Sequence, residues 1–209
     1  MRNIVLITLD SLRADHCGFM GYERATTPTI DKMAKEGLFF ENAISPSTAT
    51  PVSMIGIFTG EYSQVDITKS TPGKGASVKP WRKEIDQRKT LAQLLSKKGY
   101  STAAINPNPF VSSYFGFDKG FDYFQDFLSG ENKSYRYSDT FEKHLGGSHM
   151  ASYLRILRNI IRKEEVFKPW ENYYENITDW VKKSKKPFFL WLLSLDTHHP
   201  YLAPKKFRK

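Results

Sequence analysis

The beginning of the chain places the strongest constraint on its fold. Residues 3–9 form an almost entirely apolar run of strand length that ends at Asp10. A run without polar alternation is typical of a central strand in a parallel sheet, because such a strand is buried on both faces. Further on, Thr50 and Pro51 open another apolar stretch, which predicts a helix over 50–58. A carboxylate and a hydroxyl placed in this way can build a metal-bound nucleophile, provided that both reach one edge of the sheet.

The rest of the chain predicts alternating strands and helices. Apolar runs of strand length and helix-period segments with capping residues follow one another, and the polar stretch 61–89 is expected to be loop. This order predicts an α/β fold with a mostly parallel sheet sandwiched by helices. The expected strands are 3–9, 38–44, 101–105 and 188–193, and the expected helices are 28–37, 50–58, 90–99 and 169–183.

One segment interrupts this pattern. Residues 128–168 are tyrosine-rich and then basic, with a helical pattern at 153–161, so we expect an insertion in a single domain that spans 1–209. Within it, residues 147–152 have the sequence GSHMAS, which matches a common expression-vector scar. Coincidence and an engineered junction both stay open for this stretch.

Composition narrows the classes of partner. The chain has 209 residues and a formal net charge of +9, which suits an anionic partner but does not choose among them. Basic clusters at 182–186 and 205–209 lack the interleaved aromatic residues of a nucleic-acid site, so no nucleic-acid partner is expected. No membrane span and no signal peptide are recognisable, and a cytoplasmic location is the default expectation, with a trimmed export signal as the alternative that stays open. The oligomeric state stays open.

The cysteine content excludes two kinds of structural cross-link. The single cysteine, Cys17, excludes an internal disulfide framework and a cysteine-based zinc cluster. The expected role of Cys17 is that of a buried, inert thiol.

Polar residues follow several of the predicted strands. In a parallel α/β sheet, ligands bind at the carboxyl ends of the strands, so side chains at those ends converge. The residues expected to converge are Asp10, Asn106, Asn108, Asp196 and His198, together with Thr50 at the start of a helix.

Each candidate has a plain structural alternative. Asp10 suits a hard or borderline divalent cation, but it could also cap a helix or close a turn. Thr50 could attack an ester when a metal or base activates it, or it could be a simple N-cap. His198 could bind an anion or protonate a leaving group, or lie at the surface. A lipase-type triad is disfavoured because no Gly-x-Ser-x-Gly elbow occurs, and residues 73–75 lack the order and spacing of a phosphate loop.

Several motifs together resemble the sulfatase family of the alkaline phosphatase superfamily. They are ITLDSLRADH at 7–16, GY at 21–22, TPTIDKMAKEG at 27–37, FGFDKGFD at 115–122 and HHPY at 198–201. The resemblance implies an alkaline phosphatase-like fold and hydrolysis of sulfate or phosphate esters. It also implies that Asp10 and Thr50 bind a divalent ion (Ca, Mn or Zn), that Thr50 attacks, and that Asn106, Asn108 and His198 contact a small anionic ester.

The nucleophile helix departs from the family pattern. Counting back from Thr59 and Gly60 places Thr50 at the position of the cysteine or serine that becomes formylglycine, with Val52 and Met54 where proline and arginine belong. Threonine cannot become formylglycine, so none is expected. An unmodified threonine resembles the phosphodiesterase and phosphoglycerol- or phosphoethanolamine-transferring branches of the superfamily instead. The family's lysine motif is also replaced, by NPNP at 106–109.

The resemblance also predicts whether residues 1–209 form a whole domain. In the family, the remaining metal ligands come from a later strand, so we expect residues 1–209 to be the amino-terminal part of a longer domain, inactive by itself. Two other functions stay open: a non-catalytic binding module with a sulfatase-like fold, favoured by the altered nucleophile helix, and, ranked last, nucleic-acid binding through the basic tail.

Overall fold

A four-stranded parallel sheet forms the centre of the molecule. The computed structural model describes residues 1–65, 79–126, 170–184 and 187–198. Its strands lie in the order β1-β4-β2-β3, and every pairing is parallel. The fold is therefore α/β with a parallel sheet, as the sequence predicts.

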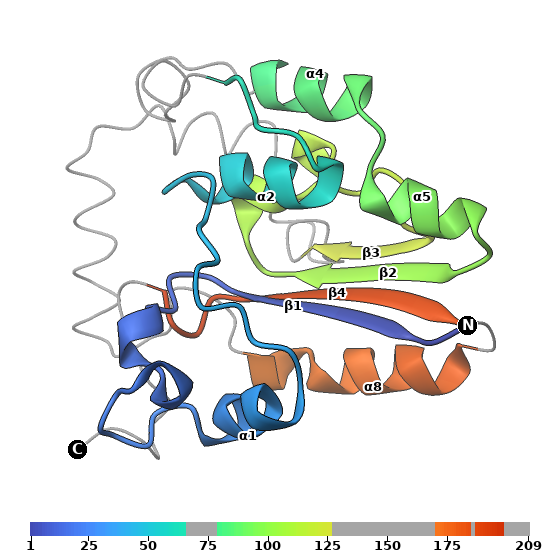
Figure 1. Cartoon of the computed structure of the whole chain (residues 1–209). Helices are drawn as coiled ribbons and strands as arrows, with labels where there is room; N and C mark the ends of the chain where they lie inside the picture. Colours follow the sequence, from blue (N-terminus) through green and yellow to red (C-terminus); the bar gives the residue numbers. More distant parts are fainter. Residues whose placement is uncertain (66–78, 127–169, 185–186, 199–209) are drawn as a thin grey trace, which may run out of the picture.

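The elements follow one another along the chain as helices between strands (Figure 1). The strands are β1 (Ile4–Leu9), β2 (Ser101–Asn106), β3 (Tyr123–Asp126) and β4 (Phe188–Ser194). The α-helices are α1 (Pro28–Glu36), α2 (Thr50–Thr59), α4 (Lys79–Gln87), α5 (Leu91–Lys97) and α8 (Tyr174–Lys183). Short 3-10 turns are η1 (Ala14–His16), η2 (Gly18–Met20), η3 (Pro109–Val111), η4 (Ser113–Phe115) and η5 (Trp170–Asn172).

The main core lies between the sheet and α2. Figure 1 shows α2 and α5 over one face of the sheet, with α4 beyond α2. Phe58 of α2 meets Trp191 of β4 edge-on, with ring centroids 4.4 Å apart, and Phe121 stacks near both Trp191 and Phe189. Trp191 also donates its indole N–H to Thr8 Oγ1 at 3.1 Å, which ties the core to β1. Aromatic packing of this kind fixes α2 on the sheet.

A second, smaller core lies on the opposite face, under α8 (Figure 1). Ile177, Trp180 and Val181 of α8 pack against buried residues of β2 and β4. The sequence predicts a helix over 169–183 with an apolar stripe, and the observed α8 confirms most of it. Trp170 and Tyr174 are the exceptions, since both are exposed. The chain therefore has helices on both faces of its sheet, as expected.

Two strand predictions need correction. Residues 38–44 were expected to form a strand, but no strand occurs there. A strand requires a hydrogen-bonded neighbour, and no other described strand runs beside this segment. Conversely, β3 was not predicted, because its short sequence YFQD has no apolar run and only its pairing with β2 defines it.

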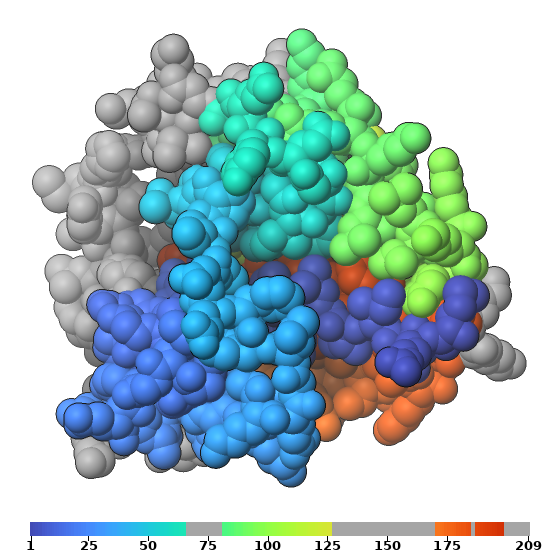
Figure 2. All heavy atoms as spheres, viewed as in Figure 1, coloured from blue at the N-terminus to red at the C-terminus, as the bar shows by residue number. Residues whose placement is uncertain are grey.

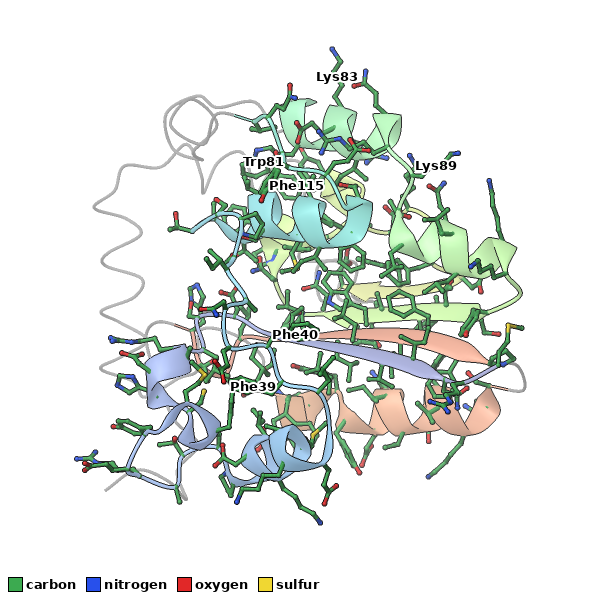
Figure 3. The ribbon with its side chains drawn as sticks, viewed as in Figure 1. Phe39, Phe40, Trp81, Lys83, Lys89 and Phe115 are labelled. Atoms are coloured by element: carbon green, nitrogen blue, oxygen red, sulfur yellow. The ribbon has the colours of Figure 1, made fainter. Side chains whose placement is uncertain are left out.

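The loop prediction for 61–89 also needs correction. Residues 79–87 form α4, which is held by two buried side chains one helical turn apart, Trp81 and Ile85. Figure 3 shows Trp81 close to Phe115, and their ring centroids lie 5.4 Å apart. Two apolar residues are too few for a clear helical period, so tertiary packing decides this helix.

Other predictions fall on residues outside the described part of the chain. The predicted insertion at 128–168, its helix at 153–161 and the GSHMAS stretch at 147–152 all belong to this group. In the described residues, no helix has both the length and the apolar character needed to cross a bilayer.

Cys17 provides a test of the core beside η1 and η2. The side chain is 1% exposed, and burial raises the pKa of its thiol. The reactive thiolate is therefore disfavoured in the folded protein, and Cys17 is the only cysteine, so one modification reports on one site. We expect alkylation by iodoacetamide at pH 8 to be about 100-fold slower than in urea-unfolded protein. Equal rates by mass spectrometry would show that Cys17 is accessible.

Candidate active site

Asp10 and Thr50 meet at the carboxyl end of the sheet. Thr50 Oγ1 donates a hydrogen bond to Asp10 Oδ2 at 3.0 Å, although forty positions separate the two residues. Both side chains are half-buried. The carboxylate from the first strand and the hydroxyl from the first residue of α2 therefore share one site, which is the geometry that the sequence predicts.

The pairing of β1 with β4, the two described strands that lie farthest apart in the sequence, holds Asp10 in place. β1 runs beside β4 in register, and the ladder continues through Asp10, whose N–H donates to the Ser194 carbonyl at 3.0 Å. Directly after it, Ser11 adopts a φ of +63°, a conformation that non-glycine residues rarely take. Its hydroxyl donates to Asp10 Oδ1 at 3.2 Å. The chain thus turns sharply away and leaves the carboxylate facing the site.

Thr50 is fixed by the way α2 begins. Ala49 precedes the helix in an extended conformation, Pro51 lies in the first turn, and Ser53 N–H donates to the Ala49 carbonyl at 3.0 Å. The buried Ser53 hydroxyl also donates to the Ser47 carbonyl at 2.8 Å and lies 3.1 Å from Ser45 Oγ. These bonds bind the loop before the helix to its first turn, so Thr50 has a defined position.

The two asparagines at the carboxyl end of β2, Asn106 within the strand and Asn108 after it, have different environments. Asn108 Nδ2 donates to Asp10 Oδ2 at 3.3 Å, so it contacts the same oxygen as Thr50. The side chain of Asn106 is fully buried, and its Oδ1 accepts from Asn108 N–H at 2.8 Å while its Nδ2 donates to the Val111 carbonyl. The structure therefore brings Asn108 to the site, whereas Asn106 supports the loop that carries it.

The turn after β4 completes the edge. Thr197 Oγ1 donates to the main-chain carbonyl of Asp10 at 2.7 Å, a contact that sequence reasoning missed. His198 comes next, half-buried, with its N–H bonded to the Leu195 carbonyl at 2.9 Å. Asp196 is exposed and interacts locally with Ser194, so its carboxylate is engaged within the turn. A hydroxyl one residue before the HHPY motif was the only sequence signal for Thr197.

A cavity of about 320 Å³ opens over Asp10 and Thr50, while Asn108, Thr197 and His198 are not among its described lining residues. Hydroxyl side chains dominate its polar lining, and among the described lining residues Asp10 is the only carboxylate and no lysine or arginine occurs. The lining consists of Thr8, Leu9, Asp10, Ser11, Leu12, Ser45, Ser47, Thr48, Thr50, Ser53, Met54 and Leu193.

The donor set suits part of a metal site. A carboxylate oxygen and a hydroxyl oxygen 3.0 Å apart are donors of the type that hard divalent cations prefer. A full shell needs more ligands, and in the described residues no three His, Cys, Asp or Glu side chains gather as a metal cluster. Asp10 and Thr50 therefore fit the role of two ligands, and the rest must come from elsewhere.

Comparison with known proteins now identifies the family. A family model described as Sulfatase matches residues 2–209. The chain belongs to the sulfatase family. An arylsulfatase from Clostridium perfringens is 30% identical over 225 residues, and the match covers 97% of this chain and 44% of that protein.

Solved structures agree with the family at the level of the fold. A protein of the alkaline phosphatase superfamily from Vibrio parahaemolyticus matches with a TM-score of 0.58 at 19% identity, covering 100% of this chain and 44% of that one. A phosphonate monoester hydrolase from Agrobacterium radiobacter matches with a TM-score of 0.62 at 17% identity, covering 98% and 43%. The fold is therefore that of the alkaline phosphatase superfamily, and this chain spans less than half the length of each of these proteins.

The left-handed residue beside Asp10 generates a stability prediction. Because a β-branched side chain is strained at positive φ, we expect Ser11→Val to lower the free energy of unfolding by about 1–2 kcal/mol. Ser11→Gly removes the same hydroxyl without that strain and should stay within about 1 kcal/mol of wild type. Urea unfolding measures both. Equal effects of the two variants would mean that backbone strain at this position is unimportant.

Proposed function

We propose that this chain contributes the nucleophile half of an enzyme that cleaves sulfate or phosphate esters, with Thr50 as the attacking residue. The contact between Thr50 Oγ1 and Asp10 Oδ2 at 3.0 Å is the observation that carries this proposal. Membership of the sulfatase family supports the class of reaction. The family match and the site geometry are independent of each other, since one compares whole sequences and the other joins two side chains.

The proposed reaction has two steps. Thr50 Oγ1 attacks the sulfur or phosphorus of the ester, the bond to the alcohol oxygen breaks, and a covalent threonyl ester forms. The Thr50 hydroxyl already points its proton at Asp10 Oδ2, so an acceptor is in place, while the departing alcohol oxygen takes up a proton, for which His198 is our candidate donor. Water then attacks the sulfur or phosphorus and gives a proton to His198, and the proton held by Asp10 returns to Thr50 Oγ1 as the threonyl bond breaks, so that all three groups regain their starting states.

The other residues at the edge have supporting roles in this proposal. Asn108 donates to the oxygen that faces Thr50, so it orients Asp10 and offers an amide N–H to an ester oxygen. Among the described residues no side chain caps the start of α2, so the N–H groups of its first turn and the positive end of the helix dipole would favour an anion beside Thr50. Asn106 acts indirectly, through the position of Asn108.

A divalent ion (Ca, Mn or Zn) is part of the proposal. When bound, such an ion lowers the pKa of a hydroxyl ligand and polarises the ester. Asp10 and Thr50 are its proposed ligands in this chain. No formylglycine takes part, because threonine lacks the primary alcohol or thiol from which that aldehyde is made.

Variants of Thr50 test the proposal in the whole protein. We expect Thr50→Ala to lower kcat for an aryl sulfate or aryl phosphate ester by on the order of 10³-fold or more, because the nucleophile is lost. Thr50→Ser keeps the hydroxyl and should retain measurable turnover and form a covalent seryl ester. Thr59→Ala, at the far end of the same helix, controls for disturbance of α2. Unchanged turnover in Thr50→Ala would refute the assignment.

A phosphoryl-transfer function is the second candidate, favoured by the unmodified threonine at the nucleophile position. Hydrolysis and transfer differ in what cleaves the threonyl ester, water or an alcohol. Assays with sulfate monoesters, phosphate monoesters and phosphate diesters, each with and without an added alcohol acceptor and with different metals, separate the candidates. A protein that turns over none of them and binds no divalent ion would be a binding module instead.

A further inference from the structure

The main-chain hydrogen bonds between β1 and β4 stop at Asp10. Figure 2 shows the two strands side by side, β1 in dark blue and β4 in red-orange. The Asp10 N–H donates to the Ser194 carbonyl, so a continued parallel ladder would bring the Asp196 N–H to the Asp10 carbonyl. That N–H bonds instead to Ser194 Oγ at 3.2 Å. The Asp10 carbonyl therefore lacks its ladder donor at the edge of the sheet where Thr50 lies.

The hydroxyl of Thr197 replaces that donor. Its Oγ1 donates to the Asp10 carbonyl at 2.7 Å, from one residue beyond the position that the ladder would use. Because a side chain supplies this bond, the chain can leave the sheet after β4 while the carbonyl stays paired. His198 follows directly in the sequence. One hydroxyl thus joins the strand that carries Asp10 to the neighbour of the candidate proton donor.

The turn that carries His198 is closed by its own hydrogen bonds. The His198 N–H donates to the Leu195 carbonyl at 2.9 Å, and the Ser194 hydroxyl donates to the Asp196 carboxylate. Two bonds join this turn to the segment of β1, one from the Ser194 carbonyl at its start and one from the Thr197 hydroxyl near its end. The bond from Thr197 therefore controls how the later part of the turn lies against β1.

We propose that Thr197 is a positioning residue, whose bond to the Asp10 carbonyl holds His198 where it can protonate the departing alcohol oxygen. This inference rests on the proposed function, in which Thr50 attacks the ester and His198 is the proton donor. Thr197 transfers no proton in this role and acts through His198. A proton donor must lie within about 2.6–3.2 Å of its acceptor, and a displacement of about 1 Å can cost on the order of 10²-fold in rate. A single hydrogen bond beside His198 can therefore control the protonation step.

This role predicts a dependence on the leaving group. Nitrophenol is acidic enough to depart as its anion, whereas an alkyl alcohol needs a proton as its bond to sulfur or phosphorus breaks. Loss of the Thr197 hydroxyl should therefore slow the cleavage of an alkyl ester most. A purely structural effect on Asp10 or Thr50 would slow both esters alike, because attack by Thr50 is common to both.

Thr197→Val in the whole protein tests the proposal. The measurement is kcat/KM, which covers the steps up to release of the alcohol, for a nitrophenyl and an alkyl ester of whichever acid the wild type cleaves. We expect a loss of about 10- to 100-fold with the alkyl ester and of less than about 3-fold with the nitrophenyl ester. Thr197→Ser keeps the hydroxyl and should stay within about 3-fold of wild type with both esters. Equal losses with the two esters, or no loss with either, would overturn the proposal, and Thr197→Ala repeats the test if the valine variant misfolds.

A matched control removes a similar bond far from the site. Thr102 Oγ1 donates to the Gly120 carbonyl at 3.0 Å, near the amino end of β2, so Thr102→Val also deletes a hydroxyl that pairs a main-chain carbonyl. It should leave the ratio of the two kcat/KM values unchanged. In a His198→Ala background, Thr197→Val should cause no further loss with the alkyl ester, and an additive loss would contradict action through His198.

Thr50→Ala, measured alongside, separates this inference from the proposed function. Turnover that survives in Thr50→Ala would remove the nucleophile assignment and the positioning role that rests on it. An inactive Thr50→Ala together with equal effects of Thr197→Val on the two esters would leave the nucleophile in place and reject the positioning role alone.

Discussion

The parallel pairing of β1 with β4 is the interaction on which the rest of the structure depends. It joins residues 4–9 to residues 189–194, the first and last described strands of the sheet. Through it, Asp10 receives a fixed main-chain position, because its N–H bonds to Ser194 and its carbonyl accepts from Thr197. Side chains in the core also connect the two strands, since the indole N–H of Trp191 in β4 donates to Thr8 Oγ1 in β1. The carboxylate is therefore anchored by main-chain and side-chain hydrogen bonds that join β1 to β4 and to the turn after it.

The described lining of the cavity combines one carboxylate with neutral groups. Asp10 is surrounded by donors from three different parts of the chain: the hydroxyl of Thr50, the amide of Asn108 and the hydroxyl of Ser11. In the described lining of the cavity, no cation balances this carboxylate. The motif comparison in the sequence assigns Met54 to the family's arginine position and NPNP at 106–109 to its lysine motif, and all of these side chains are uncharged. In the proposed enzyme, a bound cation would then have to supply the positive charge that an anionic ester requires.

The sequence predicts the parts of the fold that depend on local pattern. The continuous apolar runs at 3–9, 101–105 and 188–193 identify three of the four strands, and the rule that parallel strands share a carboxyl edge predicts the meeting of Asp10 and Thr50. Elements that form only because of their neighbours in the folded chain cannot be predicted from local sequence pattern. β3 exists because β2 lies beside it, and α4 because Trp81 and Ile85 find the core, whereas the apolar stretch 38–44 has no described strand to pair with.

The candidate site likewise combines features that the sequence predicts with features that only tertiary contacts decide. Asn106 and Asn108 are equivalent in the sequence, two residues apart in NPNP, and only their surroundings decide that one is buried in the loop while the other reaches Asp10. Thr197 could not be singled out because its contact is with a main-chain carbonyl rather than with a chemically distinctive partner.

The span of the β1–β4 pair also has a consequence for biosynthesis. During translation, β1 leaves the ribosome before the other described strands, and its partner β4 follows about 180 residues later. At typical elongation rates of ~5–20 residues per second, the apolar segment waits roughly 10–40 s for β4. Throughout this interval the apolar segment has no strand partner and is prone to aggregate, so chaperones that hold unfolded chains are expected to raise the yield of native protein in a host cell.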